Sequence, residues 1–415
     1  MAHEILEGKK NSIVLFISND NDNLFPLKVG RPPILFQVAG KTILEWIISI
    51  GKKYNFEKYA FLGSSEEIEM IKSILENKFP NTDNSLDLHF FEFNPQKGIS
   101  RDLSVKLIQS YLPDNSICMD GNIIFSETFF SNFLRNIQGH DKYALVKNEE
   151  QPKIFLGIGY FSKKHLENNL IGVKNAEDIY LRVSTKTASY FPTMVHNDKE
   201  NNFWKIDYLW NLLDANQKMI EYIEEKNEGE VEQGVTITGK VSIEKGAKIR
   251  SGSYLEGPLI IGENCDVGPN CYLRNGVSLG EKVRIGNACE LKNTIVYSGT
   301  HIAHLSYVGD SIIGSDCNFG AGTITGNLRL DDKTIKAQVN EIISTNRRKL
   351  GVIMGDNVKT AINVYFMPGI IVGNNSAIGT GVILNRNLPD NTFIWVEQTT
   401  NTKEWRVEPK KKKEG

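Results

Sequence analysis

The chain lacks the features of an extracellular or membrane protein. Its 415 residues include five cysteines, an odd and small number that argues against a disulfide framework. No run approaches the roughly 20 apolar residues of a membrane helix, and residues 1–7 lack the basic and apolar regions of a signal peptide. A net charge of −2 gives no general attraction to nucleic acid or to a membrane surface. These absences predict a cytoplasmic protein without nucleic-acid or membrane partners.

What the sequence has in abundance is aliphatic residues at six-residue intervals. Ten follow one another without a gap, namely Ile237, Ile243, Ile249, Leu255, Ile261, Val267, Leu273, Leu279, Ile285 and Leu291. A second series, two positions earlier, contains Cys265, Cys271 and Cys289, which we therefore interpret as small buried side chains and not as metal ligands. Helices and isolated strands have other periods. Hexads are typical of a parallel β-helix, in which each hexad forms one side of a coil.

The hexad pattern is interrupted twice. Its phase slips between Tyr297 and Ile313, around the segment 301–310, and it fails again between Ile324 and Gly351, where an insertion is expected. The pattern resumes at Met354, Thr360, Phe366, Val372, Ile378 and Leu384. Because breaks in a regular pattern are where functional sites are expected, both interruptions are candidate sites.

The first half of the chain has a different pattern. Apolar strand-like segments at 12–17, 59–62 and 89–93 alternate with helical spacing at 42–53 and 66–78. Such alternation predicts an α/β Rossmann-like domain with a mostly parallel sheet. A charged stretch at 224–230 follows a helix-like segment at 209–223. The expected organisation is an α/β domain at 1–228, a β-helix at 229–400, and a tail at 401–415 whose basic run 410–413 is expected to be exposed.

The opening of the α/β domain carries a resemblance to a known family. Leu-Phe-Pro-Leu at 24–27, Arg-Pro-Pro-Ile-Leu at 31–35 and the segment 38–45 resemble the start of sugar-phosphate nucleotidyltransferases. The resemblance implies a glycine-rich loop that cradles a nucleoside triphosphate just before this segment. Residues 18–23 instead contain two aspartates, no glycine and no cation, which opposes phosphate binding. The family's loop lysine corresponds to Pro32.

The metal site implied by that resemblance is also altered. Asn122 stands where the family has an aspartate, and Mg²⁺ prefers a carboxylate. Asp207 matches the second family aspartate. Asp120 could replace the lost ligand, but strand alternation predicts that its side chain points to the other face. We therefore expect no functional metal site and no nucleotidyl transfer; Mg²⁺ would be required only if uridylyl transfer survived.

The β-helix half resembles the GlmU-type acetyltransferases, in a form closer to their archaeal bifunctional members. The resemblance rests on His-Leu-Ser-Tyr-Val-Gly-Asp at 304–310, on 318–325, and on Asn327 within 327–331. It implies a left-handed β-helix, a homotrimer with sites between β-helices, and acetyl-CoA as the co-substrate without a metal. The expected reaction is acetyl transfer to glucosamine-1-phosphate, or to galactosamine-1-phosphate, supplying UDP-N-acetylhexosamine synthesis.

The resemblance also implies roles for individual residues. His304 matches the general base, and a histidine suits this role because the attacking amine must be neutral. Arg274 and Lys292 match the phosphate-binding pair; their separation of 18 residues, three hexads, predicts that they stack on one face. The other substrate-binding matches are Tyr307, Asn318, Asn327, Lys333 and Lys336. The thioester oxygen needs a hydrogen-bond donor during the reaction, and the candidates are Asn327, as a catalytic residue, or a backbone N–H. The expected CoA contacts are Ala361, Thr380, Arg347 and Arg348.

Other interpretations stay open at this point. His301 is expected to be an ordinary solvated histidine, and Arg347 and Arg348 could equally lie in a solvated loop. A bifunctional enzyme that retains UTP-dependent uridylyl transfer is the first alternative. The second is a non-catalytic scaffold that senses nucleotide sugars, as in translation-factor subunits with the same two-domain plan. Measurements of acetyl-CoA binding and of pyrophosphate release would distinguish these two alternatives from an acetyltransferase without uridylyl transfer.

Overall fold

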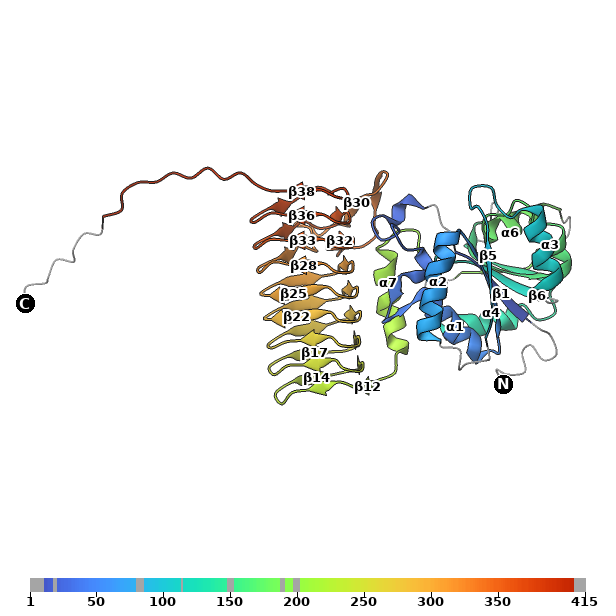
Figure 1. Cartoon of the computed structure of the whole chain (residues 1–415), viewed down its shortest axis with the longest axis horizontal. Coiled ribbons are helices and arrows are strands. Elements are labelled where there is room, and N and C mark those ends of the chain that lie inside the picture. The colour runs from blue at the N-terminus through green and yellow to red at the C-terminus, as the bar shows by residue number, and fades with distance from the viewer. Residues whose placement is uncertain are drawn as a thin grey trace, which may run out of the picture.

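The computed structural model describes residues 11–17, 21–79, 86–112, 115–147, 153–186, 191–196 and 202–406. It contains an N-terminal α/β domain and a β-helix lying side by side, and residues 395–406 extend away from the end of the β-helix (Figure 1). Two parts of the predictions, residues 18–20 of the phosphate loop and the basic run 410–413, lie outside the described residues.

The N-terminal domain is built on a seven-stranded sheet in the order β10-β8-β9-β6-β1-β4-β5. The strands are parallel except β9, which is antiparallel to both of its neighbours. Their bounds are β1 (Asn11–Phe16), β4 (Lys58–Gly63), β5 (Asp87–Glu92), β6 (Asn115–Asp120), β8 (Lys142–Val146), β9 (Phe155–Ser162) and β10 (Thr193–Val195). Two small ladders pair β2 (Gln37–Val38) with β3 (Lys41–Thr42), and β7 (Ile123–Phe125) with β11 (Phe203–Lys205).

Helices cover both faces of this sheet. One apolar cluster includes α1 (Ile43–Lys53), α2 (Ser65–Lys78), α4 (Glu127–Asn136) and α7 (Asn211–Met219). The other includes α3 (Arg101–Ser110), α5 (Lys163–Glu167) and α6 (Ala176–Lys186). Because β1 contributes Ile13 to the first cluster and Val14 to the second, its sequence is apolar without alternation. The strands and helices predicted between residues 12 and 93 are all present.

Two predicted helices start at complete capping boxes. Thr42 accepts from the backbone N–H of Glu45, and the Glu45 carboxylate accepts from the backbone of Thr42. Ser64 and Glu67 form the same reciprocal pair at the start of α2. Each box satisfies two backbone donors that the first helical turn leaves without partners, which explains why both helices begin where they do.

The second half of the chain is a left-handed parallel β-helix with three sheets, to each of which a full coil contributes one strand. The first sheet contains β12 (Lys226–Asn227), β15 (Val241–Ile243), β18 (Leu259–Ile261), β21 (Ser278–Leu279), β24 (Ile295–Val296), β27 (Ile312–Ile313), β32 (Ile353–Met354) and β35 (Ile371–Val372). Because β12 already pairs with β15, the β-helix begins at Lys226, inside the charged stretch expected to separate the domains.

The other two sheets form the remaining sides of the coils. The second sheet contains β13 (Glu230–Val231), β16 (Lys248–Ile249), β19 (Asp266–Val267), β22 (Arg284–Asn287), β25 (His301–His304), β28 (Asn318–Phe319), β33 (Lys359–Thr360), β36 (Ala377–Ile378) and β38 (Phe393–Ile394). The third sheet contains β14 (Thr236–Thr238), β17 (Tyr254–Glu256), β20 (Tyr272–Arg274), β23 (Glu290–Lys292), β26 (Tyr307–Gly309), β29 (Ile324–Thr325), β34 (Tyr365–Phe366) and β37 (Ile383–Leu384).

The hexad prediction is confirmed in the core. Leu255, Leu273 and Leu291 pair directly in successive coils, and their side chains are fully buried. Cys265, Cys271 and Cys289 are buried and unpaired, as predicted, and so are Cys118 and Cys317. Ile237, the first hexad aliphatic, is 40% exposed because it belongs to the end coil, which has a neighbour on one side only.

The phase slip consists of two shortened corners, one inside the predicted interval 297–313 and one just before it. Leu279 pairs with Val296, and Val296 with Ile313, so the coils here are one residue shorter than those with a spacing of 18. The shortening occurs after Leu291 and after Val308, at the corner that leads from the third sheet to the first. The segment 301–310 is therefore regular β-helix except at its last residues. The insertion between Ile324 and Gly351 is present and contains the hairpin of β30 (Lys336–Gln338) and β31 (Ile342–Ser344).

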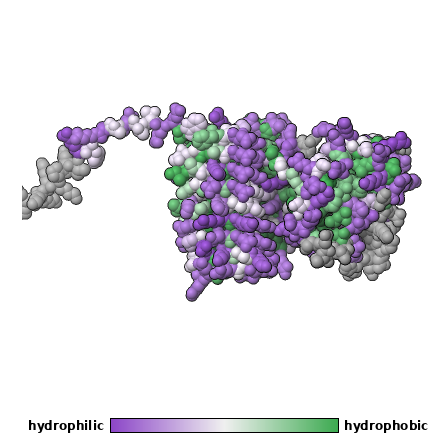
Figure 2. Space-filling view, in the orientation of Figure 1, coloured by the Kyte–Doolittle hydropathy of each residue, from purple (hydrophilic) through white to green (hydrophobic). Residues whose placement is uncertain are grey.

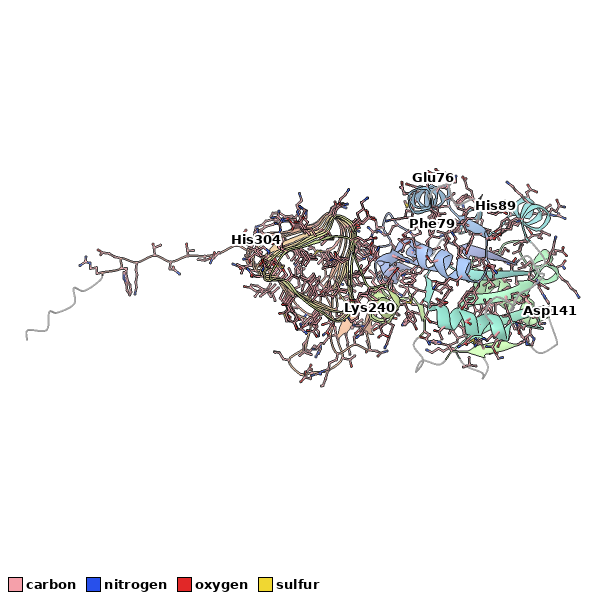
Figure 3. All side chains as sticks on the ribbon, turned by 90° about the horizontal axis from the view of Figure 1, so that it is seen from below. Glu76, Phe79, His89, Asp141, Lys240 and His304 are labelled. Atoms are coloured by element: carbon pink, nitrogen blue, oxygen red, sulfur yellow. The ribbon has the colours of Figure 1, made fainter. Side chains whose placement is uncertain are left out.

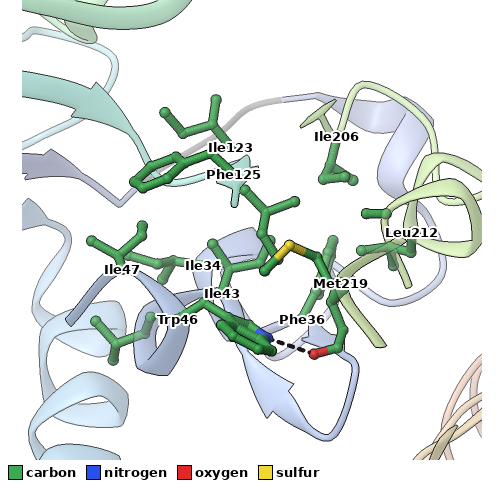
Figure 4. Packing of buried hydrophobic residues seen from close by; sticks show 14 of the residues in the cluster. Ile34, Phe36, Ile43, Trp46, Ile47, Ile123, Phe125, Ile206, Leu212 and Met219 are labelled. Carbon is green, nitrogen blue, oxygen red and sulfur yellow. Dashed lines mark hydrogen bonds between the residues drawn. The ribbon is translucent and has the colours of Figure 1, made fainter. Parts of the chain in front are cut away.

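The outer face of the first sheet is covered by the N-terminal domain. Ile260, Ile295 and Ile312 belong to the same apolar cluster as α1 and α7, and α7 lies between the two parts of the molecule (Figure 1). Figure 4 shows Met219 of α7 close to Trp46 of α1, whose indole Nε1 donates to the carbonyl of Val38 at 2.8 Å. Two faces of the β-helix remain uncovered by this domain.

The nucleotidyltransferase-like segment takes part in this interface. Arg31 forms an ion pair with Asp356 of the β-helix, and its guanidinium lies 4.7 Å from the ring centroid of Tyr297. The Tyr297 hydroxyl accepts from the backbone N–H of Gln37 at 2.9 Å. Tyr297 therefore faces the other domain and not the β-helix core, which explains why it interrupts the hexads. No helix among the described residues is long and apolar enough to cross a membrane.

Candidate functional site

Arg274 and Lys292 are directly paired neighbours on adjacent strands of the third sheet, β20 and β23. Three hexads make one coil, so residues 18 apart occupy equivalent positions in the register. The prediction that the two cations stack on one face is confirmed. Both side chains are partly buried, since side-chain exposure is 27% for Arg274 and 15% for Lys292.

Each of these cations has a carboxylate beside it, which sequence reasoning missed. Arg274 donates to Glu290 through Nη2 at 2.8 Å and through Nε at 3.1 Å. The Lys292 Nζ lies 3.7 Å from Oδ2 of Asp310. Burial lowers the pKa of Lys292, although the negative charge of Asp310 opposes this effect. Because Glu290 directly precedes the core residue Leu291, the hexad pattern indicates that its side chain points outward. Nothing in the sequence marks Glu290 as the partner of Arg274.

Asp310 is the centre of a hydrogen-bond network. It is 4% exposed, and its two carboxylate oxygens accept from Nδ2 of Asn293 at 2.8 Å and from Nδ2 of Asn327 at 2.6 Å. Asn327 Nδ2 also donates to the hydroxyl of Tyr307 at 3.2 Å. Burial raises the pKa of Tyr307, so its hydroxyl stays protonated at neutral pH.

This network decides which atom of Asn327 is available. Both hydrogens of its amide nitrogen are directed at Asp310 and Tyr307. Turning the amide over would place its oxygen against a buried carboxylate, which is unfavourable because neither atom can donate. The predicted role of Asn327 as an N–H donor to the thioester oxygen does not fit this geometry. Its side-chain oxygen remains the atom that can accept a hydrogen bond.

His304 lies at the end of β25, at the corner between the second and third sheets. Its side chain is exposed, and its carbonyl accepts from the Ser306 hydroxyl at 2.8 Å. In Figure 3 His304 lies at the edge of the β-helix farthest from the N-terminal domain, whereas Lys240 lies close to that domain. The neighbouring Leu305 is 64% exposed. This corner is thus open in a single chain.

The other predicted residues lie at two corners of the β-helix and, in the case of Asn318, on the second sheet. Ala361 and Thr380 follow β33 and β36, at the same corner as His304 and in later coils. Asn318 pairs with His301 on the second sheet, so it does not join the Asp310 network of its own chain. The remaining four, which are Lys333, Lys336, Arg347 and Arg348, all belong to the insertion at the corner between the third and first sheets.

Within the insertion, the two arginines are already paired. Arg347 forms an ion pair with Asp214 of α7, and its side chain is 13% exposed. Arg348 forms an exposed ion pair with Asp332 at 2.7 Å. Lys333 and Lys336 are exposed and line a shallow depression of about 740 Å³ together with Arg348. The prediction that Arg347 and Arg348 contact CoA stays a prediction. The structure places these two arginines at a different corner from Ala361 and Thr380.

The altered metal site of the N-terminal domain forms a separate cavity of about 270 Å³. Asp120, Asn122 and Asp207 all line it, so the prediction that Asp120 points to the other face is wrong. The physical reason is that Asp120 and Asn122 are two positions apart, and strand alternation directs side chains with that spacing to the same face. Burial raises the pKa of Asp120 to about 6, while its hydrogen bond from the Ala176 N–H lowers it.

The donors of this cavity do not suit a resident magnesium ion. Asn122 Nδ2 donates to the carbonyl of Ile206 at 3.1 Å, which leaves its Oδ1 buried without a partner. Lys174 and Lys205 also line the cavity, together with Glu177, and the two lysines repel a cation. Among the described residues, no group of three or more His, Cys, Asp or Glu side chains could hold a metal ion.

Comparisons with known proteins agree with this architecture. Residues 255–377 match the family described as the GMPPB C-terminal domain. The bifunctional protein GlmU of Methanococcus maripaludis is 35% identical over 410 residues, covering 92% of this chain and 96% of that protein. The chain belongs to the GlmU family. A GlmU of Methanocaldococcus jannaschii is 33% identical over 92% of this chain and 97% of its own length.

A further relative has a higher sequence identity over a shorter part of the chain. The bifunctional sugar-1-phosphate nucleotidylyltransferase/acetyltransferase of Sulfurisphaera tokodaii is 45% identical over 189 residues, which is 45% of this chain and 47% of that protein. Within this GlmU-family fold, the structure places Arg274, Lys292 and Tyr307 on the third sheet and brings Asn327, at the start of the insertion, into contact with Tyr307. His304 lies instead at the corner between the second and third sheets, and Asn318 lies on the second sheet.

Proposed function

We propose that this protein transfers the acetyl group of acetyl-CoA to the amine of glucosamine-1-phosphate, with galactosamine-1-phosphate as a further acceptor. The observation that carries the proposal is the network around Asp310, which orders Lys292 beside Arg274 on the third sheet and Asn327 at the corner that follows this sheet. Cations and an amide oxygen at fixed positions on one surface suit a ligand that carries both a phosphate and an amine. Residues that only cover a β-helix would not need such a buried polar network.

In this mechanism the side chains of the third sheet hold the sugar phosphate. Arg274 and Lys292 donate to the phosphate, and Asn327 Oδ1 accepts from the substrate. His304 takes a proton from the amine as the nitrogen attacks the thioester carbonyl. The C–S bond then breaks and CoA leaves as a thiolate, which takes up a proton. The developing oxyanion requires an N–H donor other than Asn327, because that amide nitrogen is already engaged.

We propose that the active form is a homotrimer with each site completed by a second copy. The third sheet carries an exposed column of large residues in register, in which Ile324 is 40%, Tyr365 38% and Ile383 61% exposed. The face of the β-helix that Figure 2 shows is largely hydrophilic, and hydrophobic residues appear toward its edge farthest from the N-terminal domain. An apolar column of this kind favours burial against another chain. Asn318, on the second sheet, would reach the site from the neighbouring copy.

For the N-terminal domain we propose that nucleotidyl transfer is lost. The support is the amide of Asn122, the lysines beside it, and the use of Arg31 in the domain interface. The second candidate is a bifunctional enzyme, and the observation that favours it is the match to bifunctional relatives along 92% of the chain.

A paired assay tests both candidates. Acetyl-CoA with each amino-sugar-1-phosphate should yield free CoA thiol, measured with a thiol reagent. UTP, Mg²⁺ and N-acetylglucosamine-1-phosphate should yield no pyrophosphate above background. Absence of thiol release with both amino sugars would overturn the acetyltransferase proposal. Pyrophosphate release would establish the bifunctional alternative.

A further inference from the structure

The two predicted phosphate-binding cations are nearly neutralised within the folded chain. Arg274 is paired with Glu290, and Lys292 lies beside Asp310. Two positive and two negative side chains give this group no net charge. A phosphate approaching it gains from Arg274 and Lys292 but is repelled by both carboxylates. A site for a dianion at this position therefore needs a further cation.

Lys349 is the side chain placed to supply it. A crevice of about 630 Å³ separates α7 from the corner between the third and first sheets, and its lining includes Lys292, Asn293, Asp310 and Lys349. Lys349 forms no salt bridge in the part of the chain that the structure describes, whereas Lys292 does. Together with burial, the positive charge of Lys349 lowers the pKa of Lys292, as expected for two ammonium groups close together.

The backbone around Lys349 is tied to the substrate site. The N–H of Leu350 donates to the carbonyl of Asn327 at 3.0 Å, and Lys349 forms a β-bridge with Leu328. These contacts join the end of the insertion to its beginning. The position of Lys349 is thereby coupled to the residue whose side chain contacts both Asp310 and Tyr307.

The same segment is anchored to the N-terminal domain. Arg347 donates through Nε to the carbonyl of Lys349 at 3.3 Å, and its guanidinium is ion-paired with Asp214 of α7. Helix α7 is itself fixed on the β-helix, because Asn216 donates to the carbonyl of Gly276 at 2.8 Å and accepts from the N–H of Ala39 at 2.8 Å. The contact from Asp214 to Arg347 thus starts from a firmly held helix.

We propose that Lys349 is a third phosphate-binding cation of the acetyltransferase site, and that the Asp214–Arg347 pair positions it. This inference rests on the proposed function of the same site. It gives the N-terminal domain a role in acetyl transfer that requires no nucleotide chemistry: its helix α7 forms one wall of the crevice and holds the basic end of the insertion beside Lys292. Lys349 is the binding residue, while Asp214 and Arg347 are positioning residues.

The test is steady-state kinetics of acetyl transfer with the full chain. Lys349→Ala should raise the KM for the sugar phosphate about tenfold, since a charge-assisted hydrogen bond is lost, with kcat and the KM for acetyl-CoA nearly unchanged. Lys349→Arg should recover most of the affinity. Asp214→Ala should raise the same KM by a smaller factor. Asp214→Arg combined with Arg347→Asp should recover affinity if the role of the pair is positional.

Lys78→Ala is the matched control, because the Lys78–Glu281 ion pair also joins the two domains, at 2.8 Å, but lies outside the crevice. It should leave all three constants unchanged. An unchanged sugar-phosphate KM in Lys349→Ala would overturn the inference while wild-type activity keeps the proposed function intact. Equal effects of Lys78→Ala and Asp214→Ala would overturn the positioning role. Wild-type protein without acetyl transfer would overturn the proposed function itself.

Discussion

Asn327 and Asp310 are joined by a hydrogen bond of 2.6 Å from an amide nitrogen to a buried carboxylate oxygen. This contact fixes the orientation of the Asn327 side chain and leaves its oxygen as the atom that can accept a hydrogen bond. It also places the negative charge of Asp310 next to Lys292. One buried carboxylate thus organises both ends of the candidate substrate surface.

Asp310→Ala should destabilise the fold and reduce acetyl transfer. It leaves the amides of Asn293 and Asn327 without their acceptor, at about 1–3 kcal/mol for each unsatisfied group. Asp310→Asn keeps the shape but removes the charge, so it should cost less stability while still allowing Asn327 to turn over. Denaturant unfolding combined with kcat measurements checks this. Full activity in Asp310→Asn would show that the orientation of Asn327 is unimportant.

His304→Ala should abolish most acetyl transfer while acetyl-CoA binding and assembly persist. Loss of a general base typically costs about 10²–10⁴-fold in rate. The histidine is exposed at a corner, so its removal should leave folding nearly unchanged. His301→Ala is the control, since His301 lies on the same strand. A rate within about threefold of wild type would rule out His304 as the base.

Arg274 and Glu290 should have opposite effects on substrate affinity. Arg274→Ala removes a charged donor, which is worth about 1.5–3 kcal/mol, and should raise the KM for the sugar phosphate. Glu290→Gln removes the carboxylate that competes for Arg274 and should lower that KM. Acetyl-CoA affinity should stay the same in both variants. An effect of Arg274→Ala on acetyl-CoA alone would require the two substrate positions to be exchanged.

Sugar-phosphate binding should weaken at alkaline pH. Burial lowers the pKa of Lys292, so this lysine loses its proton at a lower pH than an exposed lysine does. The KM for the sugar phosphate should therefore rise as pH increases through that pKa. Removing the positive charge of Lys349 should raise the pKa of Lys292 and move this rise to higher pH. A pH–KM profile that is identical in wild type and Lys349→Ala would contradict the coupling.

The N-terminal domain should remain inactive in nucleotidyl transfer even when its lost carboxylate is restored. In Asn122→Asp the two lysines of the cavity remain, and so does the ion pair between Arg31 and Asp356. Neither wild type nor this variant should release pyrophosphate from UTP and N-acetylglucosamine-1-phosphate. Activity gained only in Asn122→Asp would identify the carboxylate as the one missing element.

The sequence by itself determined the β-helix, its core and the stacking of Arg274 on Lys292. These follow from a repeat in which each side chain's direction depends only on its position within a hexad. The same local logic predicted the strands and helices between residues 12 and 93, because apolar spacing acts over a few residues.

Only the tertiary structure decided what lies between distant segments. Whether Tyr297 or Val296 enters the core depends on the domain that packs outside, and both are apolar in sequence. The partner of Arg347 is 133 residues away on α7. Such contacts depend on how one domain docks against another, and no periodicity within either segment carries that information.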